Sequence, residues 1–125
     1  MSKPGHLIMR ILLAEDDANF ARMLMGELRD EETDLDWVTN GVDAVLRTDS
    51  GRYDAILLDL HMPRMDGLSA LSIIHALHPE TAVITFSGVA GREELQESIR
   101  QGALAFLQKP FRVGELKALL DGLQA

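Results

Sequence analysis

Two short stretches of this sequence decide the expected fold: RILLAEDD at residues 10–17 and AILLD at residues 55–59. In each of them a nearly continuous apolar run ends directly in carboxylates. Such a run, without alternation of polar and apolar residues, is typical of a strand that is covered on both faces of a parallel sheet. We therefore expect two buried strands whose carboxyl ends present acidic side chains.

Three further apolar runs predict three further strands. The five predicted strands are Arg10 to Ala14, Asp36 to Thr39, Ala55 to Leu58, Ala82 to Phe86 and Ala105 to Gln108. The segments between them carry apolar residues at helical spacing, for example Phe20, Leu24 and Leu28. Strand and helix therefore alternate five times along the chain.

This alternation predicts an α/β fold built from βαβ units, whose right-handed crossovers place helices on both faces of a parallel sheet. The best match is a flavodoxin-like, doubly wound, five-stranded parallel sheet with strand order 2-1-3-4-5 and five helices. Asn40 and Asp66 are suited to cap the second and third helices, and Gly102 to end the fourth. Sheets of this kind bind ligands at the carboxyl ends of the strands, where strands one and three adjoin.

Length and composition predict a single domain over residues 1–125, with about residues 1–8 as a flexible leader. The chain has 125 residues, of which 46% are hydrophobic, enough for one core. It has no apolar run near the ~20 residues of a membrane span and no secretory signal pattern. The absence of cysteine excludes disulfides, thiolate zinc sites and a cysteine nucleophile. We expect a cytoplasmic location.

The chain is acidic, with 20 Asp and Glu residues against 12 Lys and Arg residues and a formal net charge of −8. This charge repels the phosphates of nucleic acids and anionic lipids, so direct binding to nucleic acid or to a membrane is not expected. A cation or a basic partner would complement the charge. An acidic composition is also common among soluble proteins, and composition alone gives that explanation equal weight.

The acidic residues at the strand ends form a candidate metal site. Glu15, Asp16 and Asp17 follow the first strand, and Asp59 follows the third. Several hard oxygen ligands at one sheet edge suit magnesium, so Glu15 and Asp16 are assigned to the metal and Asp59 is expected beside it. The alternative is an acidic helix start, which the helix dipole favours, and Asp17 is assigned that role.

Polar groups also end the fourth and fifth strands, at Ser87 and Lys109. Taken singly, these residues are more often a turn serine and a surface lysine. Together with a metal, they would surround Asp59 with the charges and hydrogen-bond donors that phosphoryl transfer needs. Asp59 is the expected nucleophile.

With these residues in place, the chain resembles the response-regulator receiver family from Ile11 to about Leu120. The family's motifs lie in ILLAEDD with Glu15 and Asp16, in LLDLHMPRMDG with Asp59, in FSG with Ser87 and in QKPF with Lys109. The resemblance implies that Asp59 is phosphorylated by a sensor histidine kinase or a phosphotransfer protein. It also implies that the backbone carbonyl of His61 is a further magnesium ligand.

The same resemblance implies a conformational switch made by Ser87 and Phe106, which would alter a surface on the fourth helix, fifth strand and fifth helix. This surface would contact a downstream output domain or protein, and a homodimer is also allowed. Phe106 stands where a tyrosine is often found in the family. The alternative for Phe106 is an ordinary aromatic residue of an edge strand.

Two positions tune hydrolysis of the phosphoryl group in this family, and here they are His61 and Val89. Neither residue is an acid or an amide. We expect the apolar Val89 to limit the approach of water and to make the phosphorylated form longer-lived.

Three other functions share parts of this pattern. An aspartyl phosphatase needs a second carboxylate two residues after the nucleophile, where this chain has His61. A flavin-binding module is disfavoured because Glu15 and its acidic neighbours would repel a phosphate. A receiver-like interaction module that is never phosphorylated remains the main alternative. We expect no enzyme beyond self-catalysed phosphoryl transfer and dephosphorylation.

Overall fold

The computed structural model describes residues 8–88 and 92–124, so residues 1–7 of the expected leader lie outside the described residues. Strands and helices alternate five times along the chain. The strands are β1 (Met9–Ala14), β2 (Thr33–Val38), β3 (Ala55–Asp59), β4 (Ala82–Ser87) and β5 (Ala105–Gln108). The helices are α1 (Ala18–Leu28), α2 (Gly41–Ser50), α3 (Gly67–Leu77), α4 (Arg92–Arg100) and α5 (Val113–Gln124).

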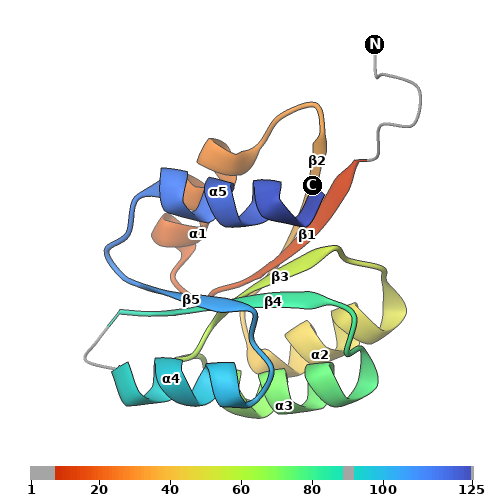
Figure 1. Ribbon diagram of the computed structural model, residues 1–125, viewed down its shortest axis with the longest axis vertical. Helices are drawn as coiled ribbons and strands as arrows, with labels where there is room; N and C mark the ends of the chain where they lie inside the picture. The colour runs from red at the N-terminus through yellow and green to blue at the C-terminus, as the bar shows by residue number, and fades with distance from the viewer. Residues whose placement is uncertain (1–7, 89–91, 125) are drawn as a thin grey trace.

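The strands form one parallel sheet in the order β2-β1-β3-β4-β5, which confirms the predicted fold. Helices α1 and α5 cover one face of the sheet, and α2, α3 and α4 cover the other (Figure 1). Alternate residues of each inner strand point to opposite faces, as the pleat requires. In β1, Ile11 and Leu13 join the core under α1 and α5, whereas Leu12 and Ala14 join the core under α2 and α3.

Strand β2 begins earlier than predicted, at Thr33 rather than Asp36, and ends at Val38 rather than Thr39. The sequence TDLDWV carries two acidic residues within the strand, so its apolar signal is weak. Asp34 and Asp36 lie 3.4 and 3.7 Å from the Arg10 guanidinium. An edge strand accommodates such charges because one side is open to solvent.

Local signals mark the helix ends as predicted. The Asp17 carboxylate accepts hydrogen bonds from the backbone N–H groups of Asn19 and Phe20 and so caps α1. Asn40 and Asp66 cap α2 and α3 in the same way. Gly102 follows α4 with a φ of +114°, a backbone conformation that favours glycine.

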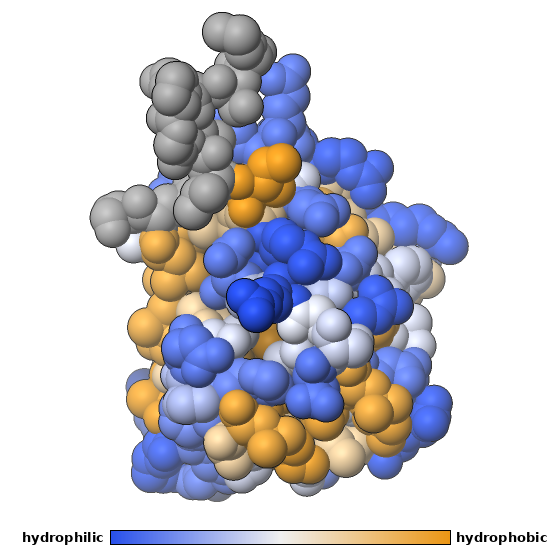
Figure 2. Space-filling model, turned by 90° about the vertical axis from the view of Figure 1, so that its right-hand side faces the viewer, coloured by the Kyte–Doolittle hydropathy of each residue, from blue (hydrophilic) through white to orange (hydrophobic). Residues whose placement is uncertain are grey.

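The strands are parallel, so their carboxyl ends meet at one rim, which lies toward the left of Figure 1. The opposite end of the molecule, at the amino ends of the strands, carries hydrophilic side chains across its middle and hydrophobic ones below them (Figure 2). None of the helices within the described residues combines the length and the apolar character needed to cross a bilayer.

Candidate functional site

The carboxyl ends of β1 and β3 lie side by side, and each carries a buried carboxylate. Glu15 follows β1 and is fully buried, and Asp59 is the last residue of β3 and is 4% exposed. The backbone of Glu15 is held in place by two hydrogen bonds. Its N–H donates to the Val38 carbonyl (3.0 Å), and its carbonyl accepts from the Trp37 indole (2.8 Å). The two carboxylates therefore rest on rigid strands.

The Lys109 ammonium lies between these carboxylates. Its Nζ is 2.7 Å from Glu15 Oε1 and 3.2 Å from Asp59 Oδ2. Lys109 directly follows β5, and its backbone N–H donates to the Ser87 carbonyl at the end of β4 (2.8 Å). The side chain thus reaches from the edge of the sheet to its centre, across the carboxyl ends of three strands.

Aromatic rings line the path of the lysine side chain. The Lys109 Nζ lies 4.1 Å from the ring centroid of Phe20 and 5.2 Å from that of Phe86. These rings and that of Phe111 pack against one another with centroid separations of 5.9 to 6.0 Å. Cation–π attraction and packing therefore hold the ammonium over the site. Phe20 was predicted only as part of a helical core stripe.

The three carboxylates of Glu15, Asp16 and Asp59 bring one oxygen each within 4.8 Å of one another. Together with the Lys109 ammonium, they carry two more negative charges than positive ones. Burial raises the pKa of the Glu15 carboxyl, and the nearby Asp59 adds to this effect, while hydrogen bonds from Lys109 and Asp17 oppose it. Asp16 is exposed, but some desolvation and the neighbouring Glu15 still raise the pKa of its carboxyl. A divalent cation with hard oxygen ligands fits this donor set and its charge.

The pKa of Lys109 is set by two opposing effects. Burial alone would lower it, but hydrogen bonding and attraction to Glu15 and Asp59 outweigh burial and raise the pKa above its usual value. The ammonium therefore stays charged at neutral pH.

Ser87 is fully buried as the last residue of β4, next to the lysine backbone. Phe106 of β5 is 39% exposed and pairs in register with Thr85 of β4. Thr85 is buried and shares a hydrogen bond of 2.7 Å with Ser98 of α4. Ser87 and Phe106 thus lie on neighbouring strands. Ser87 lies at the carboxyl rim of the sheet, and Phe106 lies farther from that rim. Val89 lies outside the described residues.

The loop between β3 and α3 holds Asp59 through its backbone. The N–H of His61 donates to Asp59 Oδ1 (2.9 Å), and the N–H of Gly67 donates to the Leu60 carbonyl (3.0 Å). A Cβ at Gly67 would overlap the backbone of Asp59 and Leu60, so the start of α3 packs against the end of β3 without a side chain between them. A Cβ at Gly41 would overlap the Met65 carbonyl in the same loop. The contact of Gly67 thus ties the end of the loop to its beginning, and the contact of Gly41, at the start of α2, holds the loop at Met65.

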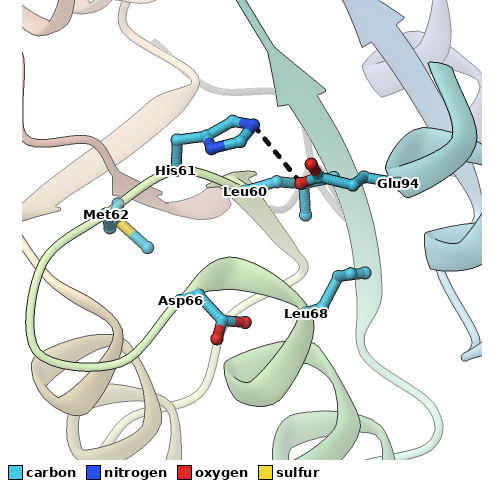
Figure 3. A pocket seen from close by; sticks show the side chains of 6 residues that line it. All are labelled: Leu60, His61, Met62, Asp66, Leu68 and Glu94. Atoms are coloured by element: carbon cyan, nitrogen blue, oxygen red, sulfur yellow. Dashed lines mark ion pairs between the residues drawn. The ribbon is translucent and has the colours of Figure 1, made fainter. Parts of the chain in front are cut away.

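The His61 side chain points across a hollow of about 480 Å³ toward α4 (Figure 3). Its Nε2 lies 3.3 Å from Glu94 Oε2 in the first turn of α4. Asp66 and Leu68 lie on the other side of the hollow (Figure 3). The sequence reasoning missed Glu94, because a residue that meets the site from the surface of a separate helix leaves no local signal.

The profile of the response regulator receiver domain family matches residues 11–121. The chain therefore belongs to the response regulator receiver family, the signalling domain of two-component systems. It is 34% identical over 113 residues to the chemotaxis protein CheY of Listeria monocytogenes, covering 88% of this chain and 94% of that protein.

Longer relatives share the same domain. The transcriptional regulatory protein QseB of Haemophilus influenzae is 34% identical over 115 residues, which cover 92% of this chain and 52% of QseB. The chain thus spans about half the length of that relative. A solved receiver domain of a sensor histidine kinase from Pseudomonas aeruginosa superposes with a TM-score of 0.80 at 27% identity, covering 94% of this chain and 99% of that chain. That structure holds a magnesium ion in its active site cleft.

Proposed function

We propose that Asp59 is the phosphoacceptor of this receiver domain and that a sensor histidine kinase or a phosphotransfer protein supplies the phosphoryl group. An oxygen of the Asp59 carboxylate attacks the phosphorus of a phosphohistidine. As the new O–P bond forms, the N–P bond breaks, and the imidazole leaves with the bonding electrons and takes up a proton. Membership of the receiver family supports this reaction class.

The observation that carries the proposal is the position of Lys109, whose Nζ lies within 3.2 Å of an oxygen of the carboxylate that would be phosphorylated. An ammonium at this place neutralises negative charge on the transferred group. Ser87, at the end of the adjacent strand, would donate a hydrogen bond to the same group. Glu15, Asp16, Asp59 and the His61 carbonyl would hold a magnesium ion, which when bound supplies positive charge to the phosphoryl oxygens.

Self-catalysed dephosphorylation would return the domain to its starting state. The oxygen of a water molecule bonds to phosphorus while the bond from phosphorus to the Asp59 oxygen breaks. The carboxylate is restored, inorganic phosphate is released, and the remaining proton goes to solvent. His61 and Val89 are proposed to tune the rate of this step by controlling how water approaches.

The output surface is proposed to lie on α4, β5 and α5, with Ser87 and Phe106 as the switch residues. Exposed apolar side chains support a protein contact there: Ile99 of α4 and Phe106 of β5 are 41% and 39% exposed, and Leu104, just before β5, is 55% exposed. An output domain, a separate target protein or a second copy of the chain could use this surface. The net charge of −8 argues against direct contact with nucleic acid or with a membrane. Cytoplasmic signalling as a single receiver domain fits these properties.

Intact-mass analysis after incubation with acetyl phosphate and magnesium tests the proposal. We expect a phosphoryl adduct on the wild-type protein and none on Asp59→Asn. The matched control is Asp121→Asn, which removes an exposed carboxylate of α5 and should leave the adduct unchanged. An adduct that persists in Asp59→Asn contradicts the assignment. A wild-type protein that takes up no phosphoryl group under these conditions favours a receiver-like interaction module that is not phosphorylated.

A further inference from the structure

The pair formed by His61 and Glu94 connects the phosphoacceptor loop to helix α4. His61 lies two residues after Asp59, and Glu94 lies 33 positions farther along the chain, in the first turn of α4. Their side chains are 51% and 44% exposed, and His61 Nε2 and Glu94 Oε2 are 3.3 Å apart. Figure 3 shows the imidazole ring turned across the hollow toward the carboxylate. The histidine is thereby drawn to the helix.

The same histidine contacts the acceptor through its backbone. The His61 N–H donates to Asp59 Oδ1 over 2.9 Å. His61 therefore contacts the Asp59 carboxylate through its backbone N–H and the Glu94 carboxylate through its side chain. His61 is thus the residue through which Glu94 is connected to the loop that follows Asp59.

We propose that Glu94 is a positioning residue that holds the His61 imidazole away from the phosphoryl group and thereby shortens the lifetime of phosphorylated Asp59. This inference rests on the proposed phosphorylation of Asp59. A phosphoryl group and the Glu94 carboxylate are both anions, and they compete for the same imidazole. With Glu94 present, the ring stays at the helix and water can reach the phosphorus.

Without Glu94, the imidazole is free to turn back and donate a hydrogen bond to a phosphoryl oxygen. It then occupies part of the space through which water approaches, so hydrolysis slows. The pair is half-exposed, and exposed pairs have modest coupling, so we expect Glu94→Ala to lengthen the lifetime of the adduct about two- to fivefold.

The lifetime experiment follows loss of the adduct by intact mass after the phosphodonor is removed, in magnesium buffer at neutral pH. Glu94→Gln keeps an acceptor oxygen for the imidazole and should retain a lifetime near that of wild type. The matched control is Glu93→Ala, which removes the same charge from the neighbouring exposed position and should change little. In a His61→Ala background, Glu94→Ala should have no further effect, because the ring on which it acts is gone.

A second measurement uses the unphosphorylated protein. Hydrogen exchange of the His61 amide, followed by NMR, should be about two- to fivefold faster in Glu94→Ala than in wild type or Glu93→Ala. Unchanged exchange overturns the positioning role. Equal adduct lifetimes in wild type and Glu94→Ala, or an equal effect of Glu94→Ala with and without His61, overturn the effect on hydrolysis while phosphorylation itself stands. A wild-type protein that forms no adduct overturns both the proposed function and the effect on lifetime.

Discussion

Charged side chains gather at both ends of the sheet, but they are exposed at the amino end and mostly buried at the carboxyl end. At the amino end lies a surface ion network, which we define as Arg10, Asp34, Asp36, Arg47 and Tyr53. Its ion pairs span 3.4 to 3.7 Å, and its charged side chains are 33% to 57% exposed. The Tyr53 hydroxyl donates to Asp36 over 2.5 Å, and the Arg10 guanidinium lies 5.0 Å above the Tyr53 ring. Figure 2 views this end of the molecule.

At the carboxyl end lie Glu15, Asp59 and Lys109, whose side chains are only 1%, 6% and 18% exposed. In the surface ion network each acid lies near a cation, and water screens the remaining charge. The buried group, with Asp16 beside it, keeps an excess of negative charge that water screens poorly. Buried excess charge costs folding free energy, and a bound cation would offset that cost, whereas the exposed network needs no ligand.

The largest expected difference between the two ends is in the free energy of unfolding after one cation is removed from each. Lys109→Met leaves two buried carboxylates without their ammonium and should lower the free energy of unfolding by about 3 kcal/mol. Arg47→Met removes one exposed partner of Asp36 and should cost less than about 1 kcal/mol. Urea unfolding in the presence of a chelator measures both. Equal losses would show that burial does not distinguish the two ends.

Magnesium should stabilise the folded protein through residues at the carboxyl end of the sheet and not through those at the amino end. At a concentration a hundredfold above its dissociation constant, a ligand specific for the folded state adds about 2.7 kcal/mol to the free energy of unfolding. We expect a gain of this size in wild type and little in Glu15→Gln. Asp36→Asn, in the surface ion network, should keep the full gain. Thermal or urea unfolding with and without magnesium measures this gain. A full gain in Glu15→Gln would show that Glu15 is not a ligand of the metal.

The smallest expected effect is a dependence of metal-free stability on pH. The pKa values of Glu15 and Asp16 are raised above their ordinary values of 4.5 and 3.8, so the folded protein holds these protons more tightly than the unfolded chain. Their contribution is present in full below those values and is lost as the pH rises through the raised pKa values. The free energy of unfolding of wild type, relative to Glu15→Gln, should therefore fall as the pH rises through this window. A difference that stays flat or rises would contradict the raised pKa of Glu15.

Much of the fold could be predicted because its signals are local. The buried strands β1 and β3 are continuous apolar runs, and Asp17, Asn40 and Asp66 are cap residues at the positions where helices begin. Strand β2 was placed too late because its two acids hide the apolar pattern. Those acids are paired with Arg10, Arg47 and Tyr53, contacts that the linear sequence does not reveal.

The candidate site likewise has parts that the sequence predicts and parts that it does not. The convergence of strand ends follows from topology alone, so carboxylates at the ends of β1 and β3 had to be neighbours. The insertion of the Lys109 ammonium between Glu15 and Asp59 depends on the path of a long side chain over the Phe20 ring. The approach of Glu94 to His61 depends on how α4 packs. Contacts of this kind are set by tertiary packing, which residue type and spacing do not encode.

The close backbone contacts that Gly67 and Gly41 make with the β3–α3 loop have a consequence for how this domain can diversify. Gly67 lies against the backbone of Asp59, and Gly41 lies against the Met65 carbonyl. With the loop anchored in this way, we expect that an exposed tip residue such as Pro63 can be exchanged without moving the Asp59 carboxylate. Under the proposed function, the surface of the loop tip can therefore change between relatives while the arrangement of charges beneath it stays the same.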